Sequence, residues 1–402
     1  MDKLATPLLN CGAKVRHSFE ISYIFARKIA KIFRHASFAL QGVPRTFRHV
    51  SLLGEKWHLH GIKVCAKVLR MGKILGIGNA LVDALVQLED DQLLAQLDLP
   101  KGSMQLIDVA RYRQLQVMQS AYPVKRTTGG SACNTILAVA HLGGQAGLIG
   151  KVGSDEAGAF FAHSFEAQGV SMHLLVEAEM PTGVASTFIT PDGQRTFGTF
   201  LGAASALQPS ELRREWFEGY SYFYIEGYLV QNHALISRAV SLAREAGLKV
   251  CVDMASYNIV EADRDFFAKL LPLTDIVFAN EQEAAAYTGH ADVQANVETL
   301  SELCRLAVVK VGKNGVIVRE GNCQLSCPAC DVPQVVDTTA AGDYFSAGFL
   351  YAHSTGCSLM ECARLGSLLS GHIIEVVGTA LPQIVWQNIR KALPAKADSS
   401  FK

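Results

Sequence analysis

Long hydrophobic runs are missing from the 402-residue sequence. No stretch of about 18 uncharged apolar residues occurs, and a helix that crosses a bilayer needs roughly that length. Proline is scarce as well, with 12 residues against 34 glycines. This ratio argues against a disordered, Pro-rich chain and favours many tight turns between strands and helices. We therefore expect a folded α/β protein with no membrane association.

Two site patterns are also missing. The sequence contains no GxxxxGK[ST] phosphate loop, which excludes a P-loop enzyme. Its 10 cysteines are scattered through hydrophobic segments, unlike those of a small disulfide scaffold. The tightest group is Cys323, Cys327 and Cys330, and no second pair or nearby histidine follows to complete a zinc site. Reduced thiols in a cytoplasmic protein are the expectation.

The formal net charge of +0 hides an uneven distribution. Residues 1–70 carry 13 Lys and Arg against three acids, and the remaining residues carry 24 basic and 34 acidic residues. The stretch Phe25–Arg34 could form a basic amphipathic helix, as in membrane-surface or targeting segments. Alternatively, Met71 is the true start, and residues 1–70 are a non-native or disordered extension. Apart from this charge, nothing in the chain points to nucleic-acid binding.

From residue 73 onward, short apolar runs alternate with helical patterns, which predicts βαβ units and a mainly parallel, doubly wound sheet flanked by helices. We place this domain at residues 71–395. The predicted strands are 73–78, 146–152, 222–225, 248–253, 276–279 and 306–311. The predicted helices are 155–168, 233–245, 264–271, 281–288 and 297–304.

Two segments, 81–125 and 183–200, depart from this alternation. In the second, Pro191-Asp192-Gly193 separates two β-rich stretches, which indicates a hairpin. Strands outside the main sheet often form a flap that excludes water from a reactive phosphate. We therefore predict a small β-rich lid.

The sharpest chemical signal is Asp337–Phe349, which begins Asp-Thr-Thr-Ala-Ala-Gly-Asp. It follows a predicted β run, Val332–Val336, and opens a helical stretch. Small residues before a helix allow backbone N–H groups to face an anion, and the helix dipole adds to the attraction. Asp343 would then lie beside a docked phosphate as a base for a hydroxyl nucleophile. Stabilisation of its own helix is the alternative role for this acid.

This stretch resembles the C-terminal signature of the ribokinase-like (PfkB) carbohydrate kinases, usually written DTTGAGDxFxAG. The resemblance implies that Asp343 is the base and that Ala341, Gly342 and Asp343 bind the transferring phosphate through their N–H groups. Ala340 replaces the first glycine of GAGD. Alanine still offers its backbone N–H there, provided that the position does not need a positive φ; the departure bears on the geometry of the anion site and not on the assignment.

Other motifs follow in the order that the family requires. Thr128–Asn134 resembles its GGxxxN signature, and the resemblance implies that Gly129, Gly130 and Asn134 contact the acceptor. Asn79 and Asp83 end the first strand, where ligands of open α/β sheets lie. In the family, an aspartate there binds two neighbouring hydroxyls. A glycine turn that merely opens a helix remains the alternative for Gly129-Gly130.

Three further matches concern the nucleotide. Asn280-Glu281-Gln282-Glu283 matches the family's NxxE motif, in which Glu283 would organise Mg²⁺ through water; a helix-start acid explains it equally well. Lys310, Gly312 and Gly315 resemble the strand and turn near ATP, and Gly378 resembles a loop that borders the adenine pocket. The resemblance covers about residues 72–394.

The resemblance implies ATP- and Mg²⁺-dependent phosphorylation of a primary hydroxyl on a small molecule. The spacing from Gly78 to Asp83 is more like the adenosine kinase branch, so adenosine to AMP is favoured. The alternatives are a ribokinase, fructokinase or 2-keto-3-deoxygluconate kinase activity, or a silent binding protein. Members are monomers or homodimers, and some are activated by monovalent cations; the sequence leaves both questions open.

Overall fold

The computed structural model describes residues 57–59, 62–64, 72–192 and 194–393. The chain divides into two units, Met1–Val68 and Leu69–Lys402. In the first unit, β1 (Trp57–Leu59) and β2 (Ile62–Val64) pair as antiparallel strands. The helix predicted for Phe25–Arg34 lies outside the described residues. All of the features below belong to the second unit.

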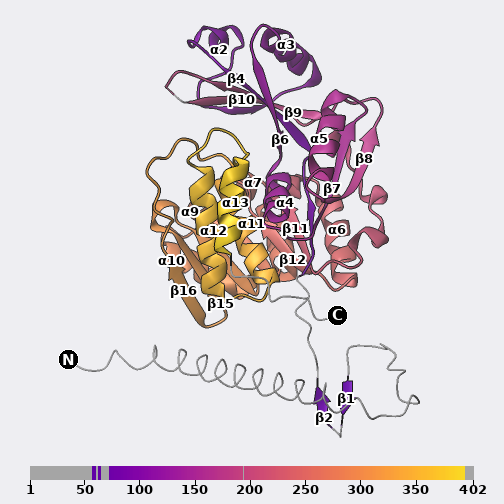
Figure 1. The fold of residues 1–402 in the computed structure, drawn as a ribbon, viewed down its shortest axis with the longest axis vertical. Coiled ribbons are helices and arrows are strands. Elements are labelled where there is room, and N and C mark those ends of the chain that lie inside the picture. The colour runs from indigo at the N-terminus through magenta and orange to yellow at the C-terminus, as the bar shows by residue number, and fades with distance from the viewer. Residues whose placement is uncertain (1–56, 60–61, 65–71, 193, 394–402) are drawn as a thin grey trace, which may run out of the picture. The chain divides into compact units, whose positions relative to one another are not determined.

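A nine-stranded sheet forms the centre of the second unit, in the order β16-β15-β14-β13-β12-β11-β3-β7-β8 (Figure 1). The strands from β14 to β8 run parallel, and β15 and β16 add an antiparallel edge. This confirms the predicted doubly wound fold. The bounds are β3 Ile74–Ile77, β7 Ala146–Gly153, β8 Ser171–Glu177, β11 Tyr222–Glu226, β12 Lys249–Asp253, β13 Ile276–Asn280, β14 Leu306–Lys310, β15 Val316–Glu320 and β16 Cys323–Cys327.

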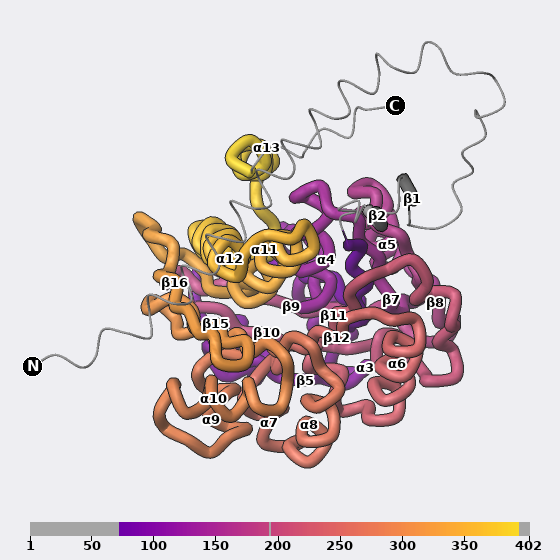
Figure 2. Tube along the Cα trace, turned by 90° about the horizontal axis from the view of Figure 1, so that it is seen from below, coloured from indigo at the N-terminus to yellow at the C-terminus, as the bar shows by residue number. Residues whose placement is uncertain are grey.

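Helices cover both faces of this sheet, with α4, α11 and α12 on one side and α6 to α10 on the other (Figure 2). Each face therefore has its own hydrophobic core, and strands such as β11 contribute alternate residues to the two cores, Tyr224 to one and Phe223 to the other. The helices are α4 Ser131–His141, α5 Glu156–Glu166, α6 His233–Glu245, α7 Tyr257–Ala262, α8 Arg264–Leu270, α9 Glu281–Thr288, α10 Val293–Leu303, α11 Ala341–Ser354, α12 Leu359–Ile373 and α13 Gln383–Ala392.

Two sequence predictions need correction. The run Val332–Val336 is not a strand, and Val335 and Val336 are 56% and 42% exposed. Pro333 interrupts this run, and proline cannot donate a ladder hydrogen bond. Helix α10 begins a turn earlier than predicted, because the Asp292 side chain accepts a hydrogen bond from the Ala295 N–H and caps it there.

A second, five-stranded sheet forms the lid, in the order β5-β10-β9-β4-β6. It lies above the large sheet in Figure 1, together with the short helix α2 and with α3. The predicted hairpin is present, because β9 and β10 pair as antiparallel strands. The bounds are β4 Leu81–Gln87, β5 Met104–Leu106, β6 Val124–Gly129, β9 Gly183–Ile189, β10 Arg195–Phe200, α2 Gln92–Gln96 and α3 Val109–Gln119.

The order of the large sheet creates a switch point next to β3. From β3 the chain moves outward to β7 and β8, then returns to the other side of β3 with β11 and continues to β14. Helices that leave neighbouring strands in opposite directions open a crevice beyond the strand ends. The carboxyl ends of β3, β11, β12 and β13 therefore converge where a ligand has room to bind.

Candidate active site

Asp343 lies in the first turn of α11 and is held by residues of α4. Its Oδ1 accepts a hydrogen bond from Ser131 Oγ at 2.7 Å, and its Oδ2 accepts one from Asn134 Nδ2 at 2.9 Å. Thr135 Oγ1 donates to the Asp343 carbonyl at 3.1 Å. Burial raises the pKa of Asp343 to about 6, although the two side-chain hydrogen bonds oppose the rise. The carboxyl group is thus oriented and has a pKa suited to a base near neutral pH.

The turn before α11 departs from two expectations, the conformation of Ala340 and the availability of the Ala341 N–H. Ala340 adopts a left-handed conformation with φ of 62°, so this position does favour glycine and the substitution is not neutral. The Ala341 N–H already donates to the Thr338 carbonyl at 3.2 Å. The N–H groups of Gly342 and Asp343 lie in the first helical turn, where no preceding turn offers a carbonyl. These two are the stronger donors for a phosphate.

Lys310, at the end of β14, places a cation beside this helix start. Its Nζ lies so close to Gly342 that a Cβ added there would approach it to 3.1 Å. It also forms an ion pair with Asp253 Oδ2 at 3.3 Å. Burial lowers the pKa of Lys310, but the carboxylates of Asp253 and Glu283 outweigh this effect and raise it. The ammonium group therefore stays charged beside the first turn of α11.

Asn280 and Glu283 form a reciprocal cap at the start of α9. The Asn280 Nδ2 and N–H donate to Glu283 at 2.6 and 2.7 Å, and the Glu283 N–H donates back at 2.8 Å. Burial raises the pKa of Glu283 to about 7. Together with Asp253, it offers hard oxygen ligands on the cavity wall, which suit Mg²⁺ held mainly by phosphates and water. Within the described residues, no group of three or more His, Cys, Asp or Glu side chains forms a complete metal cage.

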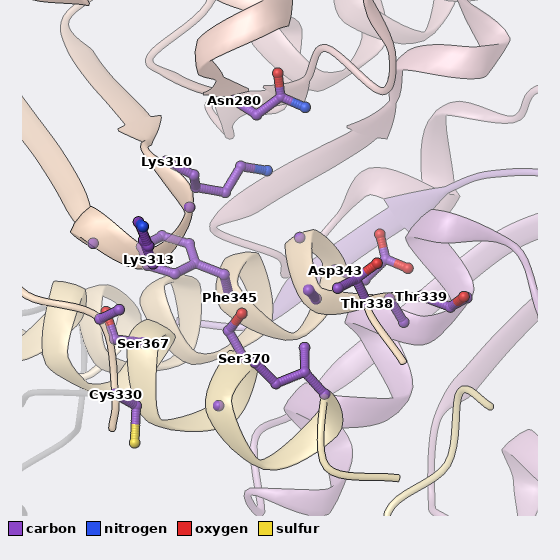
Figure 3. A pocket seen from close by; sticks show the side chains of 18 of the residues that line it. Asn280, Lys310, Lys313, Cys330, Thr338, Thr339, Asp343, Phe345, Ser367 and Ser370 are labelled. Carbon is purple, nitrogen blue, oxygen red and sulfur yellow. The ribbon is translucent and has the colours of Figure 1, made fainter. Parts of the chain in front are cut away.

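One cavity of about 1030 Å³ connects these groups, at the upper end of the range for small-molecule sites. Figure 3 shows Asp343, Thr338 and Thr339 at one end and Ser367 and Cys330 at the other. Gly312 and Gly315 line the cavity as well. Apolar and hydroxyl side chains also line the cavity: Val332, Val335, Phe345, Ser370 and Ile374. The cavity therefore combines charged side chains with apolar and hydroxyl ones.

The predicted acceptor residues gather where the lid meets the core. Asp83, on β4, accepts a hydrogen bond from Thr379 Oγ1 at 3.3 Å, and burial raises its pKa to about 7. A Cβ on Gly129 would lie 2.3 Å from Asp83 Oδ1, and one on Gly130 would lie 2.0 Å from the Asn79 carbonyl. Both glycines therefore permit a close backbone approach that no other residue allows.

The structure does not bring Gly378 to the cavity wall. Its N–H donates to Asp337 Oδ2 at 2.9 Å, beneath the lid. Arg195, from β10 of the lid, forms an ion pair with the same carboxylate at 2.6 Å and donates to Thr339 Oγ1 at 3.3 Å. These contacts join the lid to the turn that precedes Asp343.

Comparison with known proteins identifies the family. Residues 102–386 match the model of the pfkB family of carbohydrate kinases. The chain belongs to this family. It is a sugar or nucleoside kinase, and the family's members use ATP, typically with Mg²⁺.

Several relatives are similar over the whole kinase domain. An adenosine kinase from Sinorhizobium meliloti is 34% identical, with a TM-score of 0.73, and the match covers 80% of this chain and 100% of that one. A probable sugar kinase from Rhizobium etli is 32% identical, with a TM-score of 0.72 and coverage of 80% and 98%. Adenosine kinase 2 of Arabidopsis thaliana is 27% identical over 334 residues, which are 78% of this chain and 96% of that protein.

The structure adds residues to this kinase site that the motifs did not indicate. They are Ser131, Arg195, Glu226, Tyr228 and Asp253. Glu226 and Asp253 had a detectable signal, because each is an acid at the carboxyl end of a buried strand. Arg195 had none, since only the fold of the lid brings it to Asp337.

Within the described residues, no helix combines the length and the hydropathy that a bilayer span requires.

Proposed function

We propose that this kinase transfers the γ-phosphate of ATP to the primary hydroxyl of a nucleoside, with adenosine as the favoured acceptor. The observation that carries the proposal is the position of Asp343, which lies in the first turn of α11, is held by α4 and lines the cavity. The adenosine kinases among its relatives support the choice of acceptor.

The acceptor would lie between Asp83 and Asn79, with its primary hydroxyl at Asp343. Two carboxylate oxygens on Asp83 suit a pair of neighbouring hydroxyls, since an ionised carboxylate only accepts hydrogen bonds. Asp343 takes the proton of the attacking hydroxyl as the phosphoryl group arrives.

The phosphate would bind to the Gly342 and Asp343 N–H groups and to Lys310. These groups are fixed before the reaction, so they stabilise charge that develops on the transferring group without reorganising. Mg²⁺, held near Glu283 and Asp253, would supply further neutralisation of the phosphate oxygens. Closure of the lid would exclude water, which otherwise competes with the acceptor.

A sugar is the second candidate acceptor, because a probable sugar kinase is also among the similar structures. Product formation by the full chain with ATP and Mg²⁺ tests both, across adenosine, other nucleosides, ribose, fructose and 2-keto-3-deoxygluconate. We expect conversion of adenosine to AMP at the highest kcat/KM. Preferred turnover of a sugar would overturn the acceptor assignment, and no turnover with any acceptor would overturn the kinase proposal.

A further inference from the structure

Glu226 is a fully buried carboxylate that the proposed mechanism leaves without a role. It ends β11, next to β3 at the switch point of the sheet, and is 1% exposed. Its Oε1 accepts hydrogen bonds from Asn79 Nδ2 at 2.6 Å and from the Asn79 N–H at 3.4 Å. Its Oε2 accepts one from the Ala132 N–H at 2.9 Å. One carboxylate thus binds both the end of β3 and the first turn of α4.

These contacts determine how the Asn79 amide is oriented. An ionised carboxylate can only accept, so the Nδ2 group of Asn79 must face Glu226 and the Oδ1 atom must face the other way. The reverse orientation would place two acceptors against each other in a buried site, which is costly. Asn79 consequently presents its Oδ1, an acceptor, on the side away from Glu226.

The surrounding backbone is fitted closely around this contact. A Cβ on Gly78 would lie 2.6 Å from Glu226 Oε2, and Cys133 Sγ donates to the Asn79 carbonyl at 3.3 Å. This close packing leaves no room for Glu226 to shift unless β3 or α4 moves as well. Because α4 also carries Ser131 and Asn134, the same carboxylate links the acceptor side to the residues that hold Asp343.

We propose that Glu226 is a positioning residue that fixes the Asn79 amide so that its Oδ1 accepts a hydrogen bond from a hydroxyl of the acceptor substrate. This inference rests on the proposed function. With Asp83 as the other acceptor-only group, the site selects a neutral molecule that presents hydroxyl donors at both points. A carboxylate or keto oxygen at the position of either hydroxyl would face an acceptor and be rejected.

The test uses Glu226→Gln, which keeps the volume but adds a donor, so that the Asn79 amide is no longer held in one orientation. We expect the KM for the acceptor to rise about five- to tenfold, the scale of a lost hydrogen bond between two neutral groups. The KM for ATP should stay within about twofold and kcat within about threefold. The matched control is Glu298→Gln, which should leave both KM values unchanged because Glu298 forms an ion pair with Arg319 on the surface.

A double-mutant cycle separates positioning from a general structural effect. In an Asn79→Ala background, Glu226→Gln should change the acceptor KM by less than about twofold, because the group that it orients is gone. Additive effects, or an equal rise in the KM for ATP, would overturn the inference. A wild-type chain with no turnover and no acceptor binding would instead overturn the proposed function, and this inference with it.

A second measurement needs no variant. Acceptor analogues in which one ring hydroxyl is replaced by fluorine, an acceptor without a proton, should bind the wild-type chain as weakly as the deoxy analogues at the position that faces Asn79. If fluorine at every ring position binds as well as hydroxyl, the orientation assigned to Asn79 is wrong.

Discussion

The large sheet and the lid differ in how much hydrophobic surface they bury. Helices cover both faces of the large sheet, and each face has its own hydrophobic core. The lid contains one small cluster around Phe188 and Leu115, while Met104, Leu106 and Val117 on its outer elements are 54%, 60% and 72% exposed. A region with few buried apolar contacts opens at a lower free-energy cost than a well-packed core.

The functional groups divide along the same line. Asp343 and Lys310, which must be fixed when charge develops, stand on elements of the core. Asp83, the proposed acceptor ligand, and Arg195, which contacts the turn before α11, stand on lid strands. The proposed mechanism therefore assigns the chemistry to the well-packed core and part of the acceptor binding to the more loosely packed lid.

Asp343→Asn should give the largest effect and separate the two regions. Loss of the general base should lower kcat by about 10²-fold or more, while the Kd of the acceptor changes little. Asp83→Asn, the matched change in the lid, should act mainly on the KM for the acceptor. Steady-state kinetics and acceptor titration of both variants check this, and a kcat near that of the wild type for Asp343→Asn would contradict the division.

Arg195→Met tests the contact that ties the lid to the core. The Arg195 and Asp337 side chains are 10% and 5% exposed, and removing one member of a buried pair costs about 3–5 kcal/mol. We expect a loss of free energy of unfolding at the lower end of this range. Asp337 would still accept hydrogen bonds from the N–H groups of Thr339 and Gly378. Hydrogen exchange of the lid strands should speed up selectively.

The matched control for the lid contact is Arg319→Met. Arg319 pairs with Glu298, whose side chain is 50% exposed, and surface pairs contribute about 0–1 kcal/mol. If both variants lower the free energy of unfolding equally, the buried Arg195–Asp337 pair contributes no more to stability than a surface pair.

The sequence alone predicted the core better than the lid. Buried parallel strands such as β11 and β13 are short apolar runs followed by helical patterns, so local periodicity indicated them correctly. In the lid, only the hairpin had a local signal, Pro191-Asp192-Gly193. The pairing of β4 with β9 is parallel and joins distant segments, and no local pattern encodes such a contact.

The pH dependence of kcat/KM should reflect the ionisation of carboxylates in both the core and the lid. Burial raises the pKa of Asp343 to about 6 and that of Asp83 to about 7. Both must be ionised to act, so kcat/KM should fall as the pH drops through 7 and then 6, with a slope steeper than one proton. Glu226 and Glu283, with pKa values raised to about 7 by burial, titrate in the same limb.

A pH profile of kcat/KM in the full chain measures this limb, since that ratio reports groups of the free enzyme. Asp83→Asn should make it shallower by one proton. A flat profile between pH 5 and 7 would show that the carboxylates do not control activity.

The predicted site had the same pattern of success and failure. Motif order drew attention to Asp343, Asn134 and Lys310, each of which follows a strand end or lies in the first turn of a helix. In the structure, Asp343 and Lys310 line one cavity, and Asn134 lies beside Asp343. The partners of these residues were not predictable: Asn134 contacts Asp343, and Asp253 contacts Lys310. A lone acid after a strand has many structural explanations, so its partner emerges only from the packing of α4, α11 and β12.

Ala340→Gly should give the smallest effect, confined to the core. Ala340 has a φ of 62°, and a left-handed conformation costs an L-residue about 1–2 kcal/mol that glycine avoids. Glycine also gains freedom in the unfolded chain, which offsets part of that relief. We expect the free energy of unfolding to rise by roughly 0.5–1 kcal/mol, measured by denaturant titration. Hydrogen exchange in the lid should stay unchanged, because the strain lies in the turn before α11; faster or slower lid exchange would mean that this turn sets the lid's position.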